Sequence, residues 1–376
     1  MILSWIKAHR LMLIVMIVIG IGAMFFVTHN QTLYRTPIAK VIAVKNGHPQ
    51  KQTDQFENED SETNQTLTVR MLNGRYRGQT LTVKNQFTKS GAMDQRYRVG
   101  DQIFLTQLSK QHGQLSAYIK GYKRDVVLVF LTWLVIALLL LMMTTSGSLA
   151  LLSVALNVVL FIIAIKLNEF TKGDNALLIF SVLAVLFCFL SLLLVLGPNK
   201  KMLATFFATV IATSVSMLIS LLVMAMTHDR GIYFESMEYV TQVPRSIFIA
   251  ETLLGSLGAV MDESSDIIAT LFELKEIDPE VTAGQLFISG RNIGKTIMGP
   301  LINVLFLIFM ADTFTSALLY IKNGNNWGYT FAMNMSLGTV QSLVSGIGIV
   351  LAIPLVSAFA ALLLGKRGEK CQQLQP

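Results

Sequence analysis

The stretch Val126-Val-Leu-Val-Phe-Leu-Thr-Trp-Leu-Val-Ile-Ala-Leu-Leu-Leu-Leu-Met-Met143 contains no charged residue. An apolar run of about 18 residues or more can cross a bilayer core of roughly 30 Å as a helix. Similar blocks cover roughly residues 11–27, 149–165, 176–196, 202–226, 246–272, 296–321 and 340–364. The sequence therefore predicts an α-helical polytopic membrane bundle of about eight transmembrane helices.

The overall composition supports this class and excludes others. Of the 376 residues, 53% are hydrophobic and 14% are charged, against roughly a quarter charged in a soluble domain. The net charge is +7, but no basic stretch interleaved with aromatic residues occurs, so the expected partner is the lipid bilayer and not nucleic acid. The two cysteines, Cys188 and Cys371, lie outside the polar segment, and no disulfide is expected.

Residues 28–125 form a polar segment with short alternating stretches. Alternation bounded by turn residues such as Asn46-Gly47 and Asn73-Gly74 predicts strands. The expected strands cover residues 39–44, 66–71, 79–83, 102–107 and 115–119. They indicate a small all-β domain inserted between helices 1 and 2, with an OB-like or SH3-like barrel as the expected form. Residues 49–65, rich in Gln, Asn, Asp and Glu, are expected to be a mobile loop.

Four parts of the chain are predicted from these patterns. Residues 1–27 are a basic N-terminus and a retained anchor helix, 28–125 the β domain, 126–365 a seven-helix membrane domain and 366–376 a tail. Short connections that lie on the cytoplasmic side of the membrane carry more lysine and arginine than those on the outer side. With both termini inside, ten of these residues are cytoplasmic and five lie in short outer loops. We therefore expect a multi-pass protein of the cytoplasmic membrane, with residues 28–125 extracytoplasmic.

The block 246–272 is the least regular of the eight. Only about fifteen residues between Arg245 and Asp262 are mostly apolar, which would also suit a broken or re-entrant helix. A re-entrant segment, however, would invert the last two spans and place Lys366 and Arg367 outside. A full span is therefore preferred.

This block carries the candidate site. At about 100° per residue, its small and acidic residues share one strip of the helix, and they are Glu251, Gly255, Gly258, Asp262, Ser265 and Asp266. Gly255 and Gly258 predict close helix packing. The carboxylates are expected to face the bundle interior or a water-filled cavity and to bind a proton or cation. Alternatively, Glu251 pairs with Arg245 near the outer interface, and Asp262, Glu263 and Asp266 cap a helix end.

The next block adds two weaker candidates. Asn303 is a possible partner for a hydrogen bond between helices, and Asp312 lies about 180° from it on the same helix. Both cannot line one narrow path unless the helix has neighbours on two sides. Asp312 could also lie near the outer surface.

The sequence contains no complete motif of an enzyme active site. Residues 290–296 resemble a phosphate loop, but the glycines are one residue too close and no strand precedes them. The histidines lack zinc-protease spacing, and no Gly-x-Ser-x-Gly motif occurs. No catalytic residue, metal site or cofactor is predicted, and the chain is not expected to be an enzyme.

Three stretches carry a family resemblance: Asn73-Gly-Arg-Tyr-Arg-Gly-Gln-Thr80, Tyr97-Arg-Val-Gly-Asp101 and Leu257-Gly-Ala-Val-Met-Asp262. Together they resemble the YibE/F family of bacterial multi-pass membrane proteins, and the outer domain resembles the YibE type. The resemblance implies a heteromer with a shorter YibF-type membrane partner, and it implies no established activity. The chain departs from the family at Glu263-Ser-Ser-Asp266, where small and apolar residues are common.

Two functions remain open at this point. One is a permease of unknown substrate whose in-membrane carboxylates bind a proton or cation. The other is an envelope binding, signalling or assembly component whose outer β domain recognises a ligand or partner.

Overall fold

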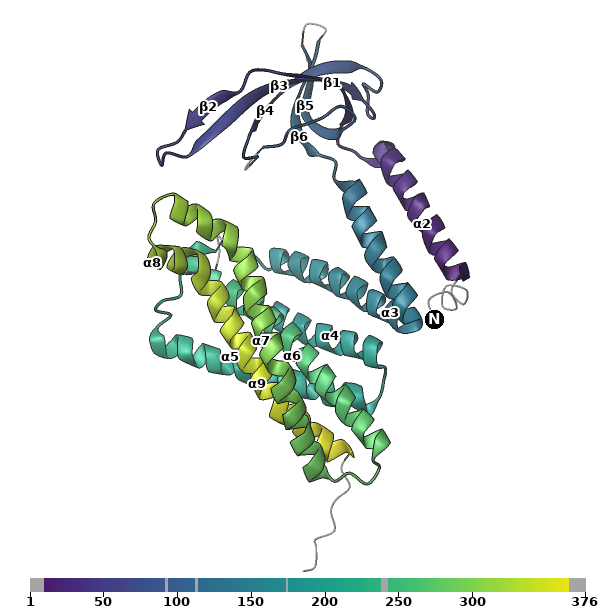
Figure 1. The fold of residues 1–376 in the computed structure, drawn as a ribbon, viewed down its shortest axis with the longest axis vertical. Coiled ribbons are helices and arrows are strands. Elements are labelled where there is room, and N and C mark those ends of the chain that lie inside the picture. The colour runs from purple at the N-terminus through teal and green to yellow at the C-terminus, as the bar shows by residue number, and fades with distance from the viewer. Residues whose placement is uncertain (1–9, 92–93, 112–113, 174, 238–242, 365–376) are drawn as a thin grey trace, which may run out of the picture. The chain divides into compact units, whose positions relative to one another are not determined.

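The computed structural model describes residues 10–91, 94–111, 114–173, 175–237 and 243–364. The predicted basic start at 1–9 and the predicted tail at 366–376 lie outside these residues. The chain divides into two compact units, residues 1–147 and 148–376. Figure 1 labels the elements of both.

The first unit contains the β domain and the helices that flank it. Its elements are α2 (Arg10–His29), η1 (Asn30–Leu33), β1 (Ile38–Asn46), β2 (Gln50–Thr53), β3 (Glu59–Met71), β4 (Thr80–Thr88), β5 (Gln102–Gln111), β6 (Gln114–Tyr122) and the first part of α3 (Asp125–Phe170). Each of the five predicted strands overlaps an observed one.

The prediction of a mobile loop at residues 49–65 is wrong, because β2 and about half of β3 lie in this segment. Strand β3 pairs with β1 through residues 65–71, with β2 through residues 59–62 and with β4 through residues 62–70. Backbone pairing on both edges holds this strand in place, so its first half needs little apolar burial. Composition alone therefore gave a misleading picture of this segment.

The strands form a curled antiparallel sheet with the order β4-β3-β1-β5-β6. Strands β4 and β6, at the two ends of this order, approach each other, but their described residues form no ladder. The domain is thus a half-open β-barrel, and its assignment as OB-like or SH3-like stays a prediction. Its core contains Ala39, Val41, Leu67, Val69, Met71, Leu81, Val83, Tyr97, Ile103 and Leu105.

Helix α3 contains two of the predicted spans. Candidate spans cover residues 125–143 and 146–170. A Cβ at Gly147 would lie 2.5 Å from the main-chain oxygen of Leu139, eight residues earlier. In a straight helix eight residues rise about 12 Å. The helix is therefore sharply bent near Gly147.

The second unit is a helical bundle. It contains the rest of α3, α4 (Ala176–Leu196), α5 (Lys200–Thr227), η2 (Phe234–Ser236), α6 (Pro244–Ile277), α7 (Ala283–Lys322), α8 (Trp327–Thr330), η3 (Phe331–Met335) and α9 (Ser336–Leu364). Helix α9 packs against α5, α6 and α7, and α7 runs beside it in Figure 1. Helix α6 in turn contacts α4, α5, α7 and α9, so α6 and α9 together form the middle of the bundle.

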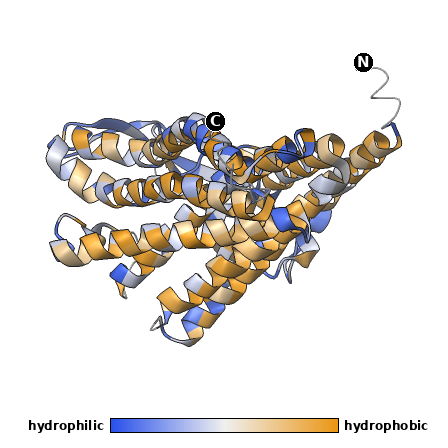
Figure 2. Ribbon diagram, turned by 90° about the horizontal axis from the view of Figure 1, so that it is seen from below, coloured by the Kyte–Doolittle hydropathy of each residue, from blue (hydrophilic) through white to orange (hydrophobic). Residues whose placement is uncertain are grey.

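Most of these helices are suited to a membrane. Seven helical segments of the described chain are long and apolar enough to cross one, and Figure 2 shows how hydrophobic the helices are. Helix α6, which carries the candidate acids, is not among the seven. It is nevertheless one unbroken helix of 34 residues, so the alternative of a broken helix is not observed. Whether α6 crosses the membrane stays a prediction.

Candidate functional site

The predicted acidic strip lies on the outward side of α6. Glu251, Gly255, Asp262 and Asp266 are all exposed. The buried side of the helix faces α4, α5 and α9 and carries residues such as Val260 and Ile267, both 0% exposed. The expectation that the carboxylates point into the bundle is not met within this chain, because the apolar face of α6 is the one that packs.

The two candidates on α7 are exposed as well. Asn303 and Asp312 lie on outward positions of the helix. No hydrogen bond or ion pair within the described residues connects either of them to the acidic strip. The five predicted polar residues are therefore exposed side chains that no hydrogen bond or ion pair of the described residues links into one site.

The predicted packing glycines of α6 meet no neighbour. No atom of the described chain lies within 4 Å of the Cβ that a side chain at Gly255 or Gly258 would have. The close helix contacts are made by other glycines. A Cβ at Gly294 of α7 would lie 2.6 Å from Ile353, and one at Gly348 of α9 would lie 2.7 Å from Val260.

A different acid, Glu263, lies inside the bundle. Its side chain is 0% exposed, and neither carboxylate oxygen has a hydrogen-bond partner among the described residues. An ionised carboxylate buried without a partner is strongly unfavourable, so a buried acid normally binds a proton, an opposite charge or a cation. Glu263 is thus the acidic side chain of α6 with the environment expected of a functional group.

Several hydroxyl groups of the same packing are also without partners. Serine and threonine in these helices mostly donate to the main-chain oxygen four residues earlier, as Thr205 does to Lys201 at 2.9 Å. The buried hydroxyls of Thr209 and Thr213 on α5, and of Ser264 on α6, have no partner in the described structure. All three side chains are 2% exposed or less.

The contacts between α5 and α6 place Thr213 and Glu263 at one level. Ser216 and Val260 both approach Gly348, and Lys201 Nζ lies 3.7 Å from Glu276 Oε1. The two helices therefore run antiparallel. Thr213 precedes Ser216 by three residues and Glu263 follows Val260 by three, so both lie one turn further in the same direction. Thr213, Glu263 and Ser264 thus form one polar layer within apolar packing, which we call the Glu263 layer, and the unpartnered hydroxyl of Thr209 lies one turn of α5 beyond it.

Carboxylate and hydroxyl oxygens are hard ligands that suit a proton or a small cation. The sequence interpretation missed this layer because it followed the acids that cluster with small residues. Glu263 is about 100° around the helix from Asp262. The available signal was its position three residues after Val260 and four before Ile267, within the apolar stripe.

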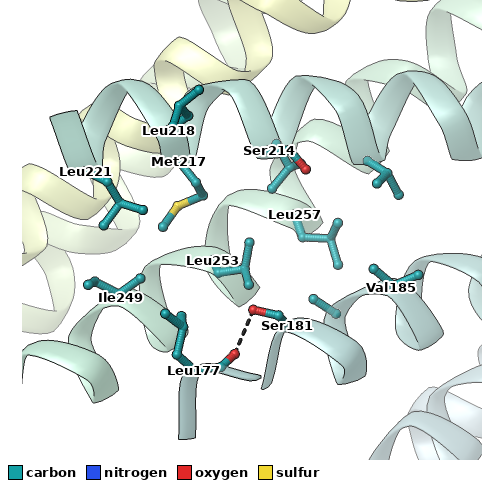
Figure 3. A pocket seen from close by; sticks show the side chains of 13 residues that line it. Leu177, Ser181, Val185, Ser214, Met217, Leu218, Leu221, Ile249, Leu253 and Leu257 are labelled. Atoms are coloured by element: carbon teal, nitrogen blue, oxygen red, sulfur yellow. Dashed lines mark hydrogen bonds between the residues drawn. The ribbon is translucent and has the colours of Figure 1, made fainter. Parts of the chain in front are cut away.

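An apolar cavity adjoins this layer. It has a volume of about 320 Å³ and lies between α4, α5 and α6. Figure 3 shows Leu253 and Leu257 of α6 opposite Met217 and Leu218 of α5. Thr213 also lines the cavity, so the cavity reaches the Glu263 layer at this residue.

Comparisons with known proteins agree with the resemblance in the sequence. The family described as YibE/F-like protein matches residues 131–366, and the YibE/F family N-terminal domain matches residues 32–122. No curated protein and no solved structure matches the chain. The two matched segments contain the polar layer and the β domain respectively, and the chain belongs to the YibE/F family.

Proposed function

We propose that the membrane helices form a permease in which Glu263 binds a proton or a cation during transport. The observation that supports this is a carboxylate that is fully buried and has no partner within the described chain. Acidic residues inside membrane bundles commonly mark ion pathways and proton relays. The unpartnered hydroxyl of Thr213 would supply a further oxygen ligand at the same level, and that of Thr209 lies one turn further along α5.

The test is ion flux into proteoliposomes that contain the full-length protein. Proton and Na⁺ gradients are imposed separately, and internal pH and Na⁺ are recorded with entrapped dyes. Glu263→Gln keeps the shape of the side chain but removes the charge, and we expect flux to fall at least about tenfold, or about 1.4 kcal/mol. Wild-type flux that is unchanged in Glu263→Gln would refute the role of this residue.

Glu251→Gln and Asp262→Asn are the matched controls on the same helix. Both side chains are exposed in this chain, so we expect each variant alone to keep flux within about twofold of wild type. The strip would contribute only where another subunit covers it. We therefore propose a YibF-type partner against this face, because exposed carboxylates are costly in contact with lipid.

Co-reconstitution tests this part of the proposal. With a YibF-type protein present, Glu251→Gln and Asp266→Asn should weaken the co-purification of the two proteins or lower the ion flux. Without the partner, neither substitution should change the flux. Equal behaviour with and without the partner would contradict an interface on this face. Asn303→Ala and Asp312→Asn on α7 provide the same comparison for the other exposed candidates.

We also propose that the termini are cytoplasmic and the β domain extracytoplasmic, with α6 as a full span. Support comes from the distribution of lysine and arginine in the short connections. Single cysteines at Gln86 and at Lys200 test it in intact cells. A membrane-impermeant maleimide should label the first and leave the second unlabelled, and the reverse pattern would overturn the orientation.

A second candidate function is ligand recognition by the β domain. A polar cleft of about 620 Å³ lies between the β4–β5 connection and β6, with Lys120 and Arg124 on its wall. In it, Asp94 Oδ1 and Gln95 Oε1 are buried without a partner in the described residues. This function predicts no flux under any gradient. It also predicts that a bound partner slows the hydrogen exchange of residues 85–91 and 94–97 of the protein in membranes. Asp94→Asn should remove this slowing.

A further inference from the structure

The cavity between α4, α5 and α6 combines apolar walls with a few hydroxyl groups. Its lining is almost entirely apolar and includes Leu177, Val185, Met217, Leu218, Leu253 and Leu257. Figure 3 shows Met217, Leu253 and Leu257 in the space between the three helices. This apolar pocket is open on one side, where Leu218 is 56% exposed, and it suits a ligand with an apolar body.

The polar groups of the lining differ in their hydrogen bonding. Ser181 donates to the main-chain oxygen of Leu177 at 2.7 Å, as drawn in Figure 3. The Thr213 hydroxyl is buried and has no partner in the described chain. One wall of the cavity thus offers a free oxygen, and this wall is at the level of Glu263.

The charge at this level restricts the class of ligand further. The cavity lining contains no charged residue of either sign, and the buried Glu263 lies behind it, at the height of Thr213 on the neighbouring helix. An anion would find no opposite charge there. A bare inorganic cation would make no use of the leucine and valine walls. An organic cation with a bulky apolar body would satisfy both the walls and the carboxylate.

We propose that this cavity binds a lipophilic organic cation, with its apolar body between α4, α5 and α6 and its charge directed toward Thr213 and Glu263. This inference rests on the proposed role of Glu263 as the charge-binding group. It adds the substrate class, which the buried carboxylate alone does not define.

The test is equilibrium binding of radiolabelled tetraphenylphosphonium to the full-length protein in nanodiscs. Tetraphenylborate has nearly the same shape and the opposite charge, and it serves as the ligand control. We expect saturable binding of the phosphonium that is at least about tenfold tighter than that of the borate. Equal binding of both ions, or no saturable phosphonium binding, would overturn the proposal.

Two tryptophan substitutions on α5 provide the matched variants. Leu218 lines the cavity and is 56% exposed, whereas Leu222, one turn along, is 55% exposed and does not line it. Leu218→Trp should weaken phosphonium binding at least about tenfold, and Leu222→Trp should leave it within about twofold. The same loss in both variants would assign the binding to the lipid-facing surface and overturn the proposal.

Glu263→Gln separates this inference from the proposed function. If the variant loses ion flux and also loses phosphonium binding, both stand. If it loses flux but binds the phosphonium as wild type does, the proposed function stands and the cavity proposal fails. If neither flux nor binding changes, both fail.

Discussion

The ammonium group of Lys123 donates a hydrogen bond of 2.8 Å to the main-chain oxygen of Val27, near the end of α2. The same ammonium lies 3.1 Å from Asp125 Oδ2, which also accepts a hydrogen bond from the Tyr34 hydroxyl. Lysine near a helix C-terminus satisfies free carbonyl groups and interacts favourably with the helix dipole. One buried cation therefore joins the end of α2 to the start of α3.

Replacing this lysine should loosen the end of α2. In Lys123→Met the Val27 carbonyl loses its partner, and Asp125 keeps only the hydrogen bond from Tyr34, at a cost of roughly 1–3 kcal/mol for the buried group left unpaired. Hydrogen exchange of residues 24–33 in the full-length protein should become faster. Lys120→Met, at an exposed position nearby, is the control and should leave it unchanged. Identical exchange in both variants would contradict the role of Lys123.

The packing of α7 on α9 should tolerate no side chain at Gly294. Gly294→Leu would drive atoms into Ile353, whereas Gly255→Leu on α6 meets no atom of the described chain within 4 Å of its Cβ. Overpacking of this kind costs typically 1–3 kcal/mol. Thermal unfolding in detergent should show a clear loss for Gly294→Leu and almost none for Gly255→Leu. Equal losses would mean that Gly255 is also packed.

The β domain should depend on Gln65 for its stability. It is 1% exposed, and its amide nitrogen donates to Asn46 Oδ1 at 2.9 Å and to Tyr97 O at 3.0 Å. Its amide oxygen accepts from Asn85 Nδ2 and from Tyr97 N. Gln65→Met leaves these groups unpaired, at roughly 1–3 kcal/mol for each buried group.

The readout for Gln65→Met is proteolysis of the connection that contains Tyr97. Cleavage between residues 94 and 101 should be faster in the variant. Gln86→Met, where the side chain is exposed, should behave as wild type. A resistant Gln65→Met protein would show that this network does not hold the connection in place.

Tyr97 should make the β domain sensitive to alkaline pH. Burial of the ring raises the pKa of the Tyr97 phenol above its ordinary value of 10.0, and Asp101 adds to the shift. The folded state therefore keeps the proton more tightly than the unfolded state does. This contribution to stability is present below pH 10 and is lost as pH rises through the higher pKa of the folded state.

Tyr97→Phe removes the titrating hydroxyl and should flatten this alkaline loss. Wild type and Tyr97→Phe are unfolded with urea at pH 9 and at pH 11, and the hydrogen exchange of β5 reports the unfolding. The quantity compared is the loss of β-domain stability between the two pH values. Wild type should lose more stability between the two pH values than the variant does. Equal losses would show that other groups dominate the alkaline range.

Patterns along the chain predicted the strands and the apolar helices. Alternation placed β1, β5 and β6 correctly, because each has one face in the barrel core. The pattern failed at β2 and the first half of β3, where backbone pairing of β3 with β2 and with β4 replaces burial. Backbone pairing does not depend on apolar side chains, so it leaves no hydrophobic periodicity in the sequence.

The candidate site shows the same limit on α6. Helical periodicity correctly grouped Glu251, Asp262 and Asp266 on one face, but it could not tell which face would pack. The choice of packing face depended on α9, which lies far from α6 in the sequence. Gly348 of α9 lies close to both Val260 of α6 and Ser216 of α5. The same packing buries Glu263.

The sequence by itself determined that this chain is a membrane protein with one polar β domain, because apolar length and alternation are local properties of the chain. Only the tertiary structure decided which carboxylate is enclosed. Burial depends on the neighbouring helices, and Thr213 and Glu263 come to one level only through the antiparallel packing of α5 and α6.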